Sequence, residues 1–315
     1  YERETNPLLS RQPGIVAFSK VLTESNTTHK SVPMLMSDIT ACNFDSIYHQ
    51  KGIITAFKEA GYQTAFFSNQ RYNHSFIDFF GKEADTFDFI KEDSLDSAYN
   101  PSDDELLALV AKELSKGNQK QFIVLHTYGS HFNYRERYPS EDAFFLPDYP
   151  VEAEVKYRDN LVNAYDNTIR YTDSFLSRLI HMLEEQHVDA AMLYTSDHGE
   201  DIFDDSRHLF LHASPVPSYY QLHVPFLIWM SDNYRKNYPD LFKNAEINRQ
   251  KNISSSASFF QTMLELGGID TPSRNDSLSV INASYTEKNR VYLNDHNEAR
   301  SLNDIGMREE DFTML

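Results

Sequence analysis

The sequence predicts an α/β fold with a mostly parallel central sheet and helices on both of its faces. Apolar segments of strand length alternate along the chain with segments whose apolar residues recur at helical spacing. Polar residues follow directly after two of these strands, which is where open parallel sheets place their ligands. The 315 residues are enough to bury a sizeable core, and we expect a single domain over residues 1–315.

The first half of the chain supplies two predicted helix–strand pairs. Apolar spacing predicts a helix over Gly52–Ala60, ended by Gly61, and a buried strand over Tyr62–Ser68. Ser102 and Glu105 are spaced as a capping box ahead of a second helix. This helix is predicted to run through Leu114 to Gly117-Asn118 and to lead into the strand Phe122–His126.

The second half continues the alternation with a long helix and further strands. The predicted elements are the helix Asp159–Glu185, the strands Ala190–Tyr194 and Val224–Met230, the helix Ser254–Leu266 and a last strand Arg290–Leu293. The loops over 132–157 and 199–222 are long for a compact domain, which is typical of functional loops.

Charge and cysteine content exclude several classes of function. The 47 acidic residues outnumber the 29 basic ones and give a formal net charge of −18, which argues against nucleic acid as a partner and against polybasic docking to anionic lipid. A single cysteine, Cys42, excludes an intramolecular disulfide and any multi-cysteine metal site. No apolar run reaches the length of a membrane span.

Candidate site residues follow the predicted strands. Asp197 and His198 come just after Ala190–Tyr194, and His131 comes shortly after Phe122–His126. A carboxylate and an imidazole at this edge suit Zn²⁺, although such a pair in a loop also reads as a helix cap beside a surface histidine. His208 and His212 lie in the next loop, and either could be an ordinary loop histidine.

A third candidate lies near the start of the chain. Ser31 and Pro33 read as a helix start, with Thr28 just before it. A hydroxyl at a helix N-terminus meets aligned N–H groups and a positive dipole end, which favour an alkoxide and a bound phosphate. Simple N-capping by a threonine is the alternative explanation.

These residues together resemble a known family. The ordered motifs are Tyr1-Glu2-Arg3-Glu4-Thr5-Asn6-Pro7, Thr28-x-x-Ser31-Val32-Pro33, Gly129-Ser130-His131, Ser196-Asp197-His198-Gly199-Glu200, Leu211-His212 and His223-Val224-Pro225. Their order and spacing over about residues 1–270 resemble the phosphoethanolamine transferases, members of the alkaline phosphatase/sulfatase superfamily. The resemblance implies that fold, and a zinc-dependent transfer of phosphoethanolamine from phosphatidylethanolamine to an envelope lipid or glycan.

The resemblance also implies roles for individual residues. Thr28 would be the nucleophile and, with Asp197 and His198, a zinc ligand. His131 and His212 would bind the phosphoryl group or a second metal; His212 is preferred to His208 because Leu211-His212 keeps the family pattern. Glu200 would orient the site from outside the ligands. The acceptor would be lipid A, a core sugar or another glycan.

Two departures from the family are visible. The family carries a further zinc ligand, a glutamate, at the end of a first strand placed just before the segment that begins this chain at Tyr1. We therefore expect a fragment that lacks this strand and an N-terminal membrane anchor, with the catalytic domain in the bacterial periplasm at the inner membrane. Cys42 stands alone, whereas the lipid A enzymes carry several disulfides.

Three other functions compete with this interpretation. A phosphoglycerol transferase of the same superfamily also uses a threonine nucleophile. A sulfatase is disfavoured, because no Cys-x-Pro-x-Arg or Ser-x-Pro-x-Arg element is present. A non-catalytic binding domain derived from the enzyme is disfavoured by the joint retention of the candidate site residues.

Overall fold

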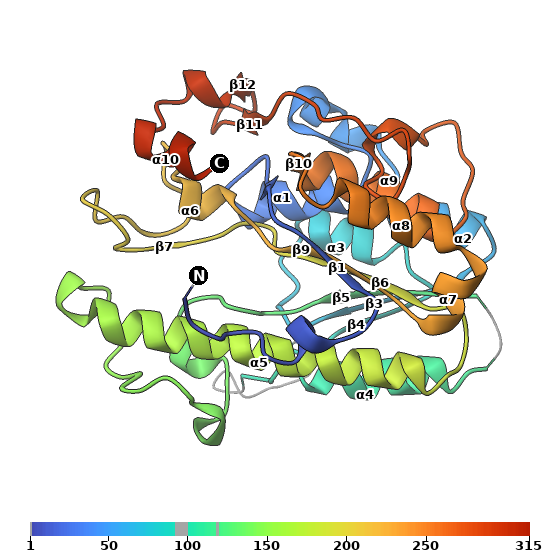
Figure 1. Cartoon of the computed structure of the whole chain (residues 1–315), viewed down its shortest axis with the longest axis horizontal. Coiled ribbons are helices and arrows are strands. Elements are labelled where there is room, and N and C mark those ends of the chain that lie inside the picture. Colours follow the sequence, from blue (N-terminus) through green and yellow to red (C-terminus); the bar gives the residue numbers. More distant parts are fainter. Residues whose placement is uncertain (1, 92–99, 118–119) are drawn as a thin grey trace.

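Two three-stranded sheets lie between layers of helices in the computed structural model, which describes residues 2–91, 100–117 and 120–315 (Figure 1). Tyr1 of the opening motif and Asn118 of the predicted helix end lie outside these residues. Among the described residues, no helix combines the length and apolar character needed to cross a membrane.

The first sheet is parallel throughout. Strand β3 (Gln63–Ser68) lies between β4 (Thr86–Phe89) and β5 (Gln121–His126), and Ala65 is level with Thr86 on one side and Ile123 on the other. The β3 residues after Gln63 are all buried, because helices cover both faces of this sheet.

The second sheet has one reversed strand. Strand β9 (Phe226–Met230) runs antiparallel to both of its partners, β1 (Ile15–Phe18) and β6 (Ala191–Thr195). The strands β1 and β6 therefore run parallel to each other. Trp229 of β9 is fully buried and packs in the same apolar cluster as Phe67 of β3, so one core extends under both sheets.

Helices cover both faces, as predicted. The lower layer in Figure 1 consists of α4 (Glu105–Leu114) and the long α5 (Arg158–Glu184). The upper layer consists of α1 (Thr28–Leu35), α2 (Ile53–Glu59), α3 (Phe76–Gly81), α7 (Asp232–Asn237), α8 (Pro239–Asn248) and α9 (Ser255–Leu266).

The remaining elements are short. They are the strands β2 (Val21–Leu22), β7 (Asp201–Ile202), β8 (Phe210–Leu211), β10 (Ile253–Ser254), β11 (Val291–Leu293) and β12 (Ala299–Ser301), and the helices α6 (Tyr219–Leu222) and α10 (Glu309–Met314). Single turns of 3₁₀ helix are interspersed, among them Tyr134–Glu136 in the long loop that follows β5.

Three local predictions are corrected by the structure. The strand predicted at Arg290–Leu293 forms, but it pairs with β12 in a hairpin outside the two sheets. Ser102 does not cap α4: Asp104 occupies the N-cap position, and the Ser102 hydroxyl instead accepts from the Asp104 backbone N–H and contacts the Tyr171 hydroxyl. Helix α1 begins at Thr28, so Ser31 and Pro33 lie inside it.

The buried amide of Gln221 joins three loops at one edge of the sheets. Its Oε1 accepts from Asn26 Nδ2 at 2.6 Å, and its Nε2 donates to Asp201 Oδ2 at 2.6 Å and to Ser214 Oγ at 2.8 Å. Asn26 precedes α1, Asp201 begins β7 after the loop that follows β6, and Ser214 belongs to the loop between β8 and α6. One side chain therefore holds these segments in register.

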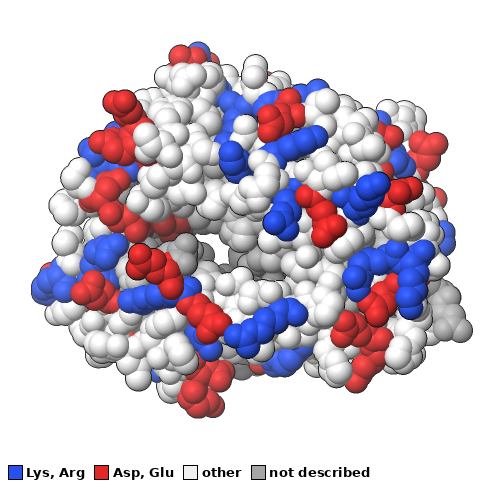
Figure 2. Space-filling view, viewed as in Figure 1, with Lys and Arg blue, Asp and Glu red and all other residues white. Residues whose placement is uncertain are grey.

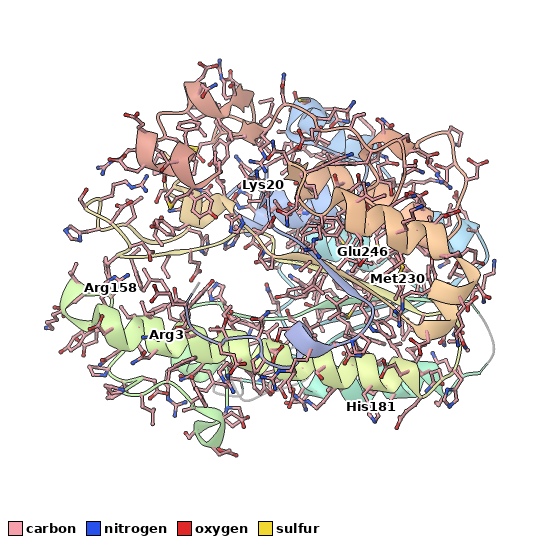
Figure 3. All side chains as sticks on the ribbon, viewed as in Figure 1. Arg3, Lys20, Arg158, His181, Met230 and Glu246 are labelled. Atoms are coloured by element: carbon pink, nitrogen blue, oxygen red, sulfur yellow. The ribbon has the colours of Figure 1, made fainter. Side chains whose placement is uncertain are left out.

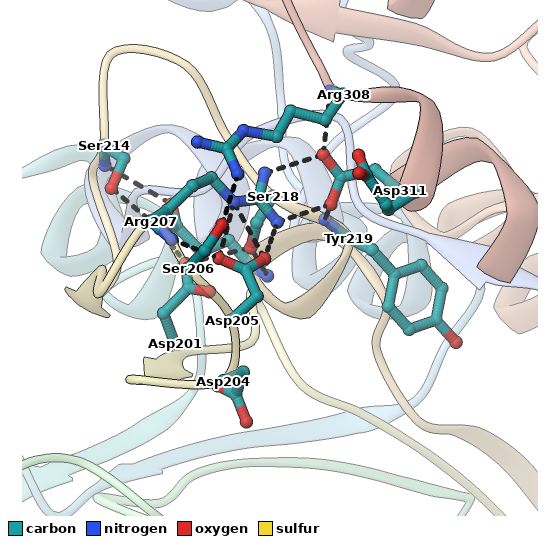
Figure 4. Close-up of polar contacts among 12 residues, drawn as sticks. Asp201, Asp204, Asp205, Ser206, Arg207, Ser214, Ser218, Tyr219, Arg308 and Asp311 are labelled. Atoms are coloured by element: carbon teal, nitrogen blue, oxygen red, sulfur yellow. Dashed lines mark hydrogen bonds and ion pairs between the residues drawn. The ribbon is translucent and has the colours of Figure 1, made fainter.

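An ion pair ties the C-terminal helix to the same loops (Figure 4). The Arg207 guanidinium donates from Nη1 and Nη2 to the two carboxylate oxygens of Asp311, at 2.7 and 2.8 Å. Asp311 also accepts from the backbone N–H groups of Tyr219 and Arg308, and its side chain is fully buried. Helix α10 therefore fixes the loop that carries His208 and His212.

We expect Asp311→Asn to reduce the free energy of unfolding by about 3 kcal/mol. Each carboxylate oxygen of Asp311 accepts hydrogen bonds from two N–H donors, and the NH₂ group of asparagine would face two of these donors instead of accepting from them. Urea unfolding of the variant measures this loss. Glu310→Gln, the same change at an exposed neighbour in α10, serves as the control and should leave the midpoint unchanged. Equal midpoints for the two variants would contradict the role of the ion pair.

Asp201 predicts a pH dependence of stability. Burial raises its pKa to about 6, although hydrogen bonds from Gln221 and Ser218 act in the opposite direction. The folded state holds this proton more tightly than the unfolded chain, so ionising Asp201 costs stability as the pH rises through the folded pKa. We expect the stability of Asp201→Asn relative to the natural chain to rise by roughly 2 kcal/mol between about pH 4 and pH 7.

Urea unfolding at several pH values measures this difference. Asp304→Asn, at an exposed aspartate, is the control whose relative stability should not change with pH. A pH-independent difference for Asp201→Asn would refute the assignment.

Candidate active site

Thr28 is the first residue of α1, at the edge of the sheets where the loops after β5 and β6 meet. Thr27 caps the helix with an extended backbone, and the N–H groups of Lys30 and Ser31 bond to its carbonyl. The Thr28 hydroxyl is thereby placed at the positive end of the helix dipole, where developing negative charge is stabilised.

The His198 imidazole faces Thr28 in a defined tautomer. Its Nδ1 lies 3.0 Å from the Gly199 carbonyl oxygen, which can only accept, so Nδ1 carries the proton. In the neutral imidazole Nε2 then carries the lone pair, and it lies 3.0 Å from Thr28 Oγ1 and 3.4 Å from Asp197 Oδ2. A hydroxyl, a carboxylate and a ligating nitrogen thus converge on one point.

Gly199 permits this arrangement through a close approach of two backbones. Its N–H donates to the Gln221 carbonyl at 2.9 Å, and a Cβ at this position would lie 2.1 Å from the Tyr220 carbonyl oxygen. Only glycine fits there. The loop that carries Asp197 and His198 is therefore packed directly on α6.

His212 is held beside His198 by a buried carboxylate. Glu200 Oε1 accepts from His212 Nδ1 at 3.0 Å, and Glu200 Oε2 accepts from the Tyr134 hydroxyl. The His198 and His212 ring centroids are 4.0 Å apart. Glu200 fixes the orientation of His212 from outside the cluster and leaves its Nε2 available toward the site.

The structure brings His131 close to this cluster and leaves His208 outside it. The His131 and His212 ring centroids are 6.3 Å apart, and His131 is exposed at the rim. The backbone N–H of His208 donates to the Asp205 carbonyl at 3.0 Å, and its side chain is exposed. His126, interpreted from sequence as a core histidine, ends β5 with Nδ1 3.0 Å from Ser68 Oγ, and burial lowers its pKa.

Sequence reasoning missed three residues that position the site. They are Tyr134, which donates to Glu200, Asp103, which accepts from the backbone N–H groups of Tyr128 and Gly129 ahead of His131, and Gln221. Each acts through a contact between segments distant in sequence, so local spacing carried no signal. A polar residue at 0% exposure, as Gln221 is, becomes conspicuous only after folding.

The donor set is compatible with zinc. Two oxygens lie near one imidazole nitrogen: Thr28 Oγ1 is 3.0 Å and Asp197 Oδ2 is 3.4 Å from His198 Nε2. Oxygen and imidazole nitrogen are ligands that zinc takes in proteins. Among the described residues, no group of three or more His, Cys, Asp or Glu is placed to hold a metal ion.

Relatives of known name resemble this chain over most of its length. Phosphoethanolamine transferase EptA of Escherichia coli K12 is 30% identical over 288 residues, which cover 86% of this chain and 50% of that protein. The chain thus spans about half the length of the curated relatives it matches.

Solved structures share the fold. The C-terminal periplasmic domain of EptC from Escherichia coli, in complex with Zn, superposes with a TM-score of 0.86 at 22% identity and covers 97% of this chain and 88% of its own. The soluble domain of lipooligosaccharide phosphoethanolamine transferase A from Neisseria meningitidis superposes with a TM-score of 0.79 at 26% identity. The match covers 89% of this chain and 85% of that domain.

The sulfatase family model matches residues 1–269, which include each of the candidate site residues described above. These residues lie at the carboxyl ends of β5 and β6 and at the start of α1, the edge where α/β sheets of this kind bind ligands. Sequence match and architecture agree, and this chain belongs to the sulfatase family, with the fold of the alkaline phosphatase superfamily and with phosphoethanolamine transferases as its relatives.

Proposed function

We propose that the chain is the catalytic domain of a zinc-dependent phosphoethanolamine transferase that works through a covalent threonine intermediate. The observation that carries the proposal is the 3.0 Å contact between Thr28 Oγ1 and His198 Nε2. A threonine that only helped to start the helix would direct its hydroxyl to the helix backbone, whereas the Thr28 hydroxyl meets an imidazole nitrogen that is flanked by a carboxylate.

Thr28, Asp197 and His198 would hold Zn²⁺. Bound there, zinc lowers the pKa of a coordinated hydroxyl and stabilises charge on a phosphoryl oxygen. The N-terminus of α1 adds its N–H groups and dipole on the same side of Thr28. Together these features activate a hydroxyl that is a poor nucleophile by itself.

The proposed reaction has two displacements. Thr28 Oγ1 attacks the phosphorus of phosphatidylethanolamine and forms a new P–O bond, the P–O bond to diacylglycerol breaks, and the proton lost by Thr28 is balanced by one taken up by diacylglycerol. An acceptor hydroxyl or phosphate oxygen then attacks the same phosphorus, the P–O bond to Thr28 breaks, and Thr28 Oγ1 takes up a proton. His131 and His212 would bind the phosphoryl oxygens, with Glu200 orienting His212.

The acceptor and the location are proposed from the relatives. The Neisseria meningitidis protein is named for lipooligosaccharide, and the Escherichia coli EptC domain is periplasmic. We propose a glycolipid or glycan acceptor on the periplasmic side of the inner membrane, reached through an anchor outside this chain. The family name does not imply sulfate ester cleavage here, since Ser31-Val32-Pro33 is followed by Met34-Leu35, without the arginine of a sulfatase element.

Thr28→Ala should abolish the covalent intermediate and reduce transfer by at least about a thousandfold, because the attacking oxygen is removed. Intact-mass measurement of the full-length enzyme incubated with phosphatidylethanolamine should show a phosphoethanolamine adduct on the natural protein alone. An adduct that persists in the variant would exclude Thr28 as nucleophile. A phosphoglycerol adduct, formed with phosphatidylglycerol instead, would assign the related phosphoglycerol transfer.

His198→Ala should lose zinc and transfer activity together, since Nε2 contributes one of the donors at the site. His187→Asn is the matched control: this exposed histidine has a φ of 55°, which asparagine tolerates, and it should retain both properties. Metal analysis and transfer assays on the full-length protein provide the two readouts. Stoichiometric zinc in His198→Ala would overturn its role as a ligand.

A further inference from the structure

Three basic side chains follow the strands of the parallel sheet, at the edge that carries the candidate site. Arg71 follows β3, Lys91 follows β4, and Arg137 lies in the long loop after β5. The carboxyl ends of parallel strands meet at one edge of a sheet, and ligands bind at that edge. We call Arg71, Lys91 and Arg137 the basic cluster.

The ring of Tyr128 supports two members of the basic cluster. Lys91 Nζ lies 4.3 Å from the centroid of this ring, and the guanidinium carbon of Arg137 lies 4.1 Å from it. The face of an aromatic ring attracts a cation without cancelling its charge. Asp103 accepts from the backbone N–H groups of Tyr128 and Gly129, at 2.8 and 2.9 Å, so the position of the ring is itself fixed.

The charge of the basic cluster is partly compensated in the described part of the chain. Lys91 Nζ donates to the neutral amide oxygen of Asn100 at 3.0 Å. Burial lowers the pKa of Lys91, and the positive charges of Arg137 and Arg71 lower it further. Glu136 raises this pKa and pairs with Arg137 at 3.1 Å, but its side chain is 57% exposed, and an exposed pair of this kind is weak. The basic cluster therefore presents positive charge at the ligand edge.

Other basic residues of the chain lie beside carboxylates. Figure 2 shows Lys and Arg side chains interspersed with Asp and Glu over one face of the molecule. Two arginines along the first half of α5 are labelled in Figure 3. Arg3 Nη1 lies 2.8 Å from Asp166 Oδ2, and Arg158 Nη2 lies 3.6 Å from Asp204 Oδ1. Lys91 differs from these residues because it bonds to a neutral amide.

The basic cluster is contiguous with the candidate site. The centroids of the Tyr128 and His131 rings are 5.0 Å apart, and those of His131 and His212 are 6.3 Å apart. Tyr128 and His131 also line the same cavity as Thr28, with a volume of about 1320 Å³. A molecule that reaches Thr28 through this cavity can therefore place a second group against the basic cluster.

We propose that the basic cluster binds a phosphate group of the acceptor glycan, separate from the phosphoryl group that Thr28 transfers. This inference rests on the proposed transferase function, which supplies the acceptor. A phosphomonoester carries close to two negative charges at neutral pH, which three cations match better than they match the single charge of a carboxylate. Guanidinium and ammonium groups donate charge-assisted hydrogen bonds to phosphate oxygens. The basic cluster would thus orient the acceptor.

The first test measures binding to the 315-residue chain by isothermal titration calorimetry, with zinc present. The probe is a glucosamine disaccharide with a phosphate at each end, and the reference is the same disaccharide with one phosphate. The natural chain should bind the doubly phosphorylated probe at least about tenfold more tightly than the reference. The double variant Arg71→Gln/Lys91→Gln should bind both disaccharides equally.

Lys120→Gln is the matched control for this test. Lys120 also lies over a tyrosine ring, 5.4 Å from the Tyr62 centroid, but it comes just before β5 begins, at the opposite edge of the sheet. This variant should keep the preference for the doubly phosphorylated probe.

The second test separates the two half-reactions of the full-length enzyme. The rate at which phosphatidylethanolamine forms the phosphoethanolamine adduct should be the same in the natural enzyme and in Arg71→Gln/Lys91→Gln. The acceptor concentration that gives half-maximal transfer from the adduct should rise at least about tenfold in the variant. Lys91→Arg, which keeps the charge, should leave this concentration close to the natural value.

Three outcomes would overturn the proposal. The first is an unchanged preference for the doubly phosphorylated probe in Arg71→Gln/Lys91→Gln, and the second is equal slowing of both half-reactions, which would indicate a structural role. The third is a loss of binding to phosphatidylglycerol vesicles with no change for the disaccharides, which would assign the basic cluster to the membrane surface. If the natural enzyme forms no adduct, the transferase function is refuted, and the calorimetric comparison still decides whether the basic cluster binds phosphate.

Discussion

The position of the candidate site depends on the buried amide of Gln221. This side chain accepts from Asn26, two residues before Thr28, and donates to Asp201, three residues after His198. Its backbone carbonyl accepts from Gly199. Gln221 therefore connects the segment before Thr28 with the segment that carries His198. This connection sets the distance between the threonine and the imidazole. An amide suits this position because it both donates and accepts.

The site has two parts, one around Thr28 and His198 and one around His212 and Glu200, and they suit different chemical roles. On one side, the Gly199 carbonyl fixes the tautomer of His198 and leaves a lone pair opposite Thr28. On the other, Glu200 holds His212 and is itself held by Tyr134 from the loop after β5. The first half suits activation of a nucleophile, and the second suits binding of a charged group. Both rest on loops tied to α10 through Arg207 and Asp311.

Much of the fold and part of the site could be predicted from the sequence. The helices over residues 53–59 and 158–184 and the strands over 63–68 and 121–126 lie within a residue or two of their predicted bounds, because each has a strong local apolar period. The predicted start of α1 was wrong, and the strand predicted at Arg290–Leu293 forms but pairs outside the two sheets. Pro33 lies inside the helix and not at its start, because Thr27 is the N-cap, and strand pairing is decided by contacts that local pattern does not encode.

The sequence by itself determined which residue types follow each strand and in what order, because these features can be read from neighbouring residues along the chain. It singled out Thr28, Asp197, His198, His131, His212 and Glu200 as candidates. Only the tertiary structure decided that His212, and not His208, stands beside His198, and that Tyr134, Asp103 and Gln221 support the site. These features depend on contacts between segments up to about 200 residues apart, such as Asn26 with Gln221, where |i−j| is 195, and such contacts exist only once the chain has folded.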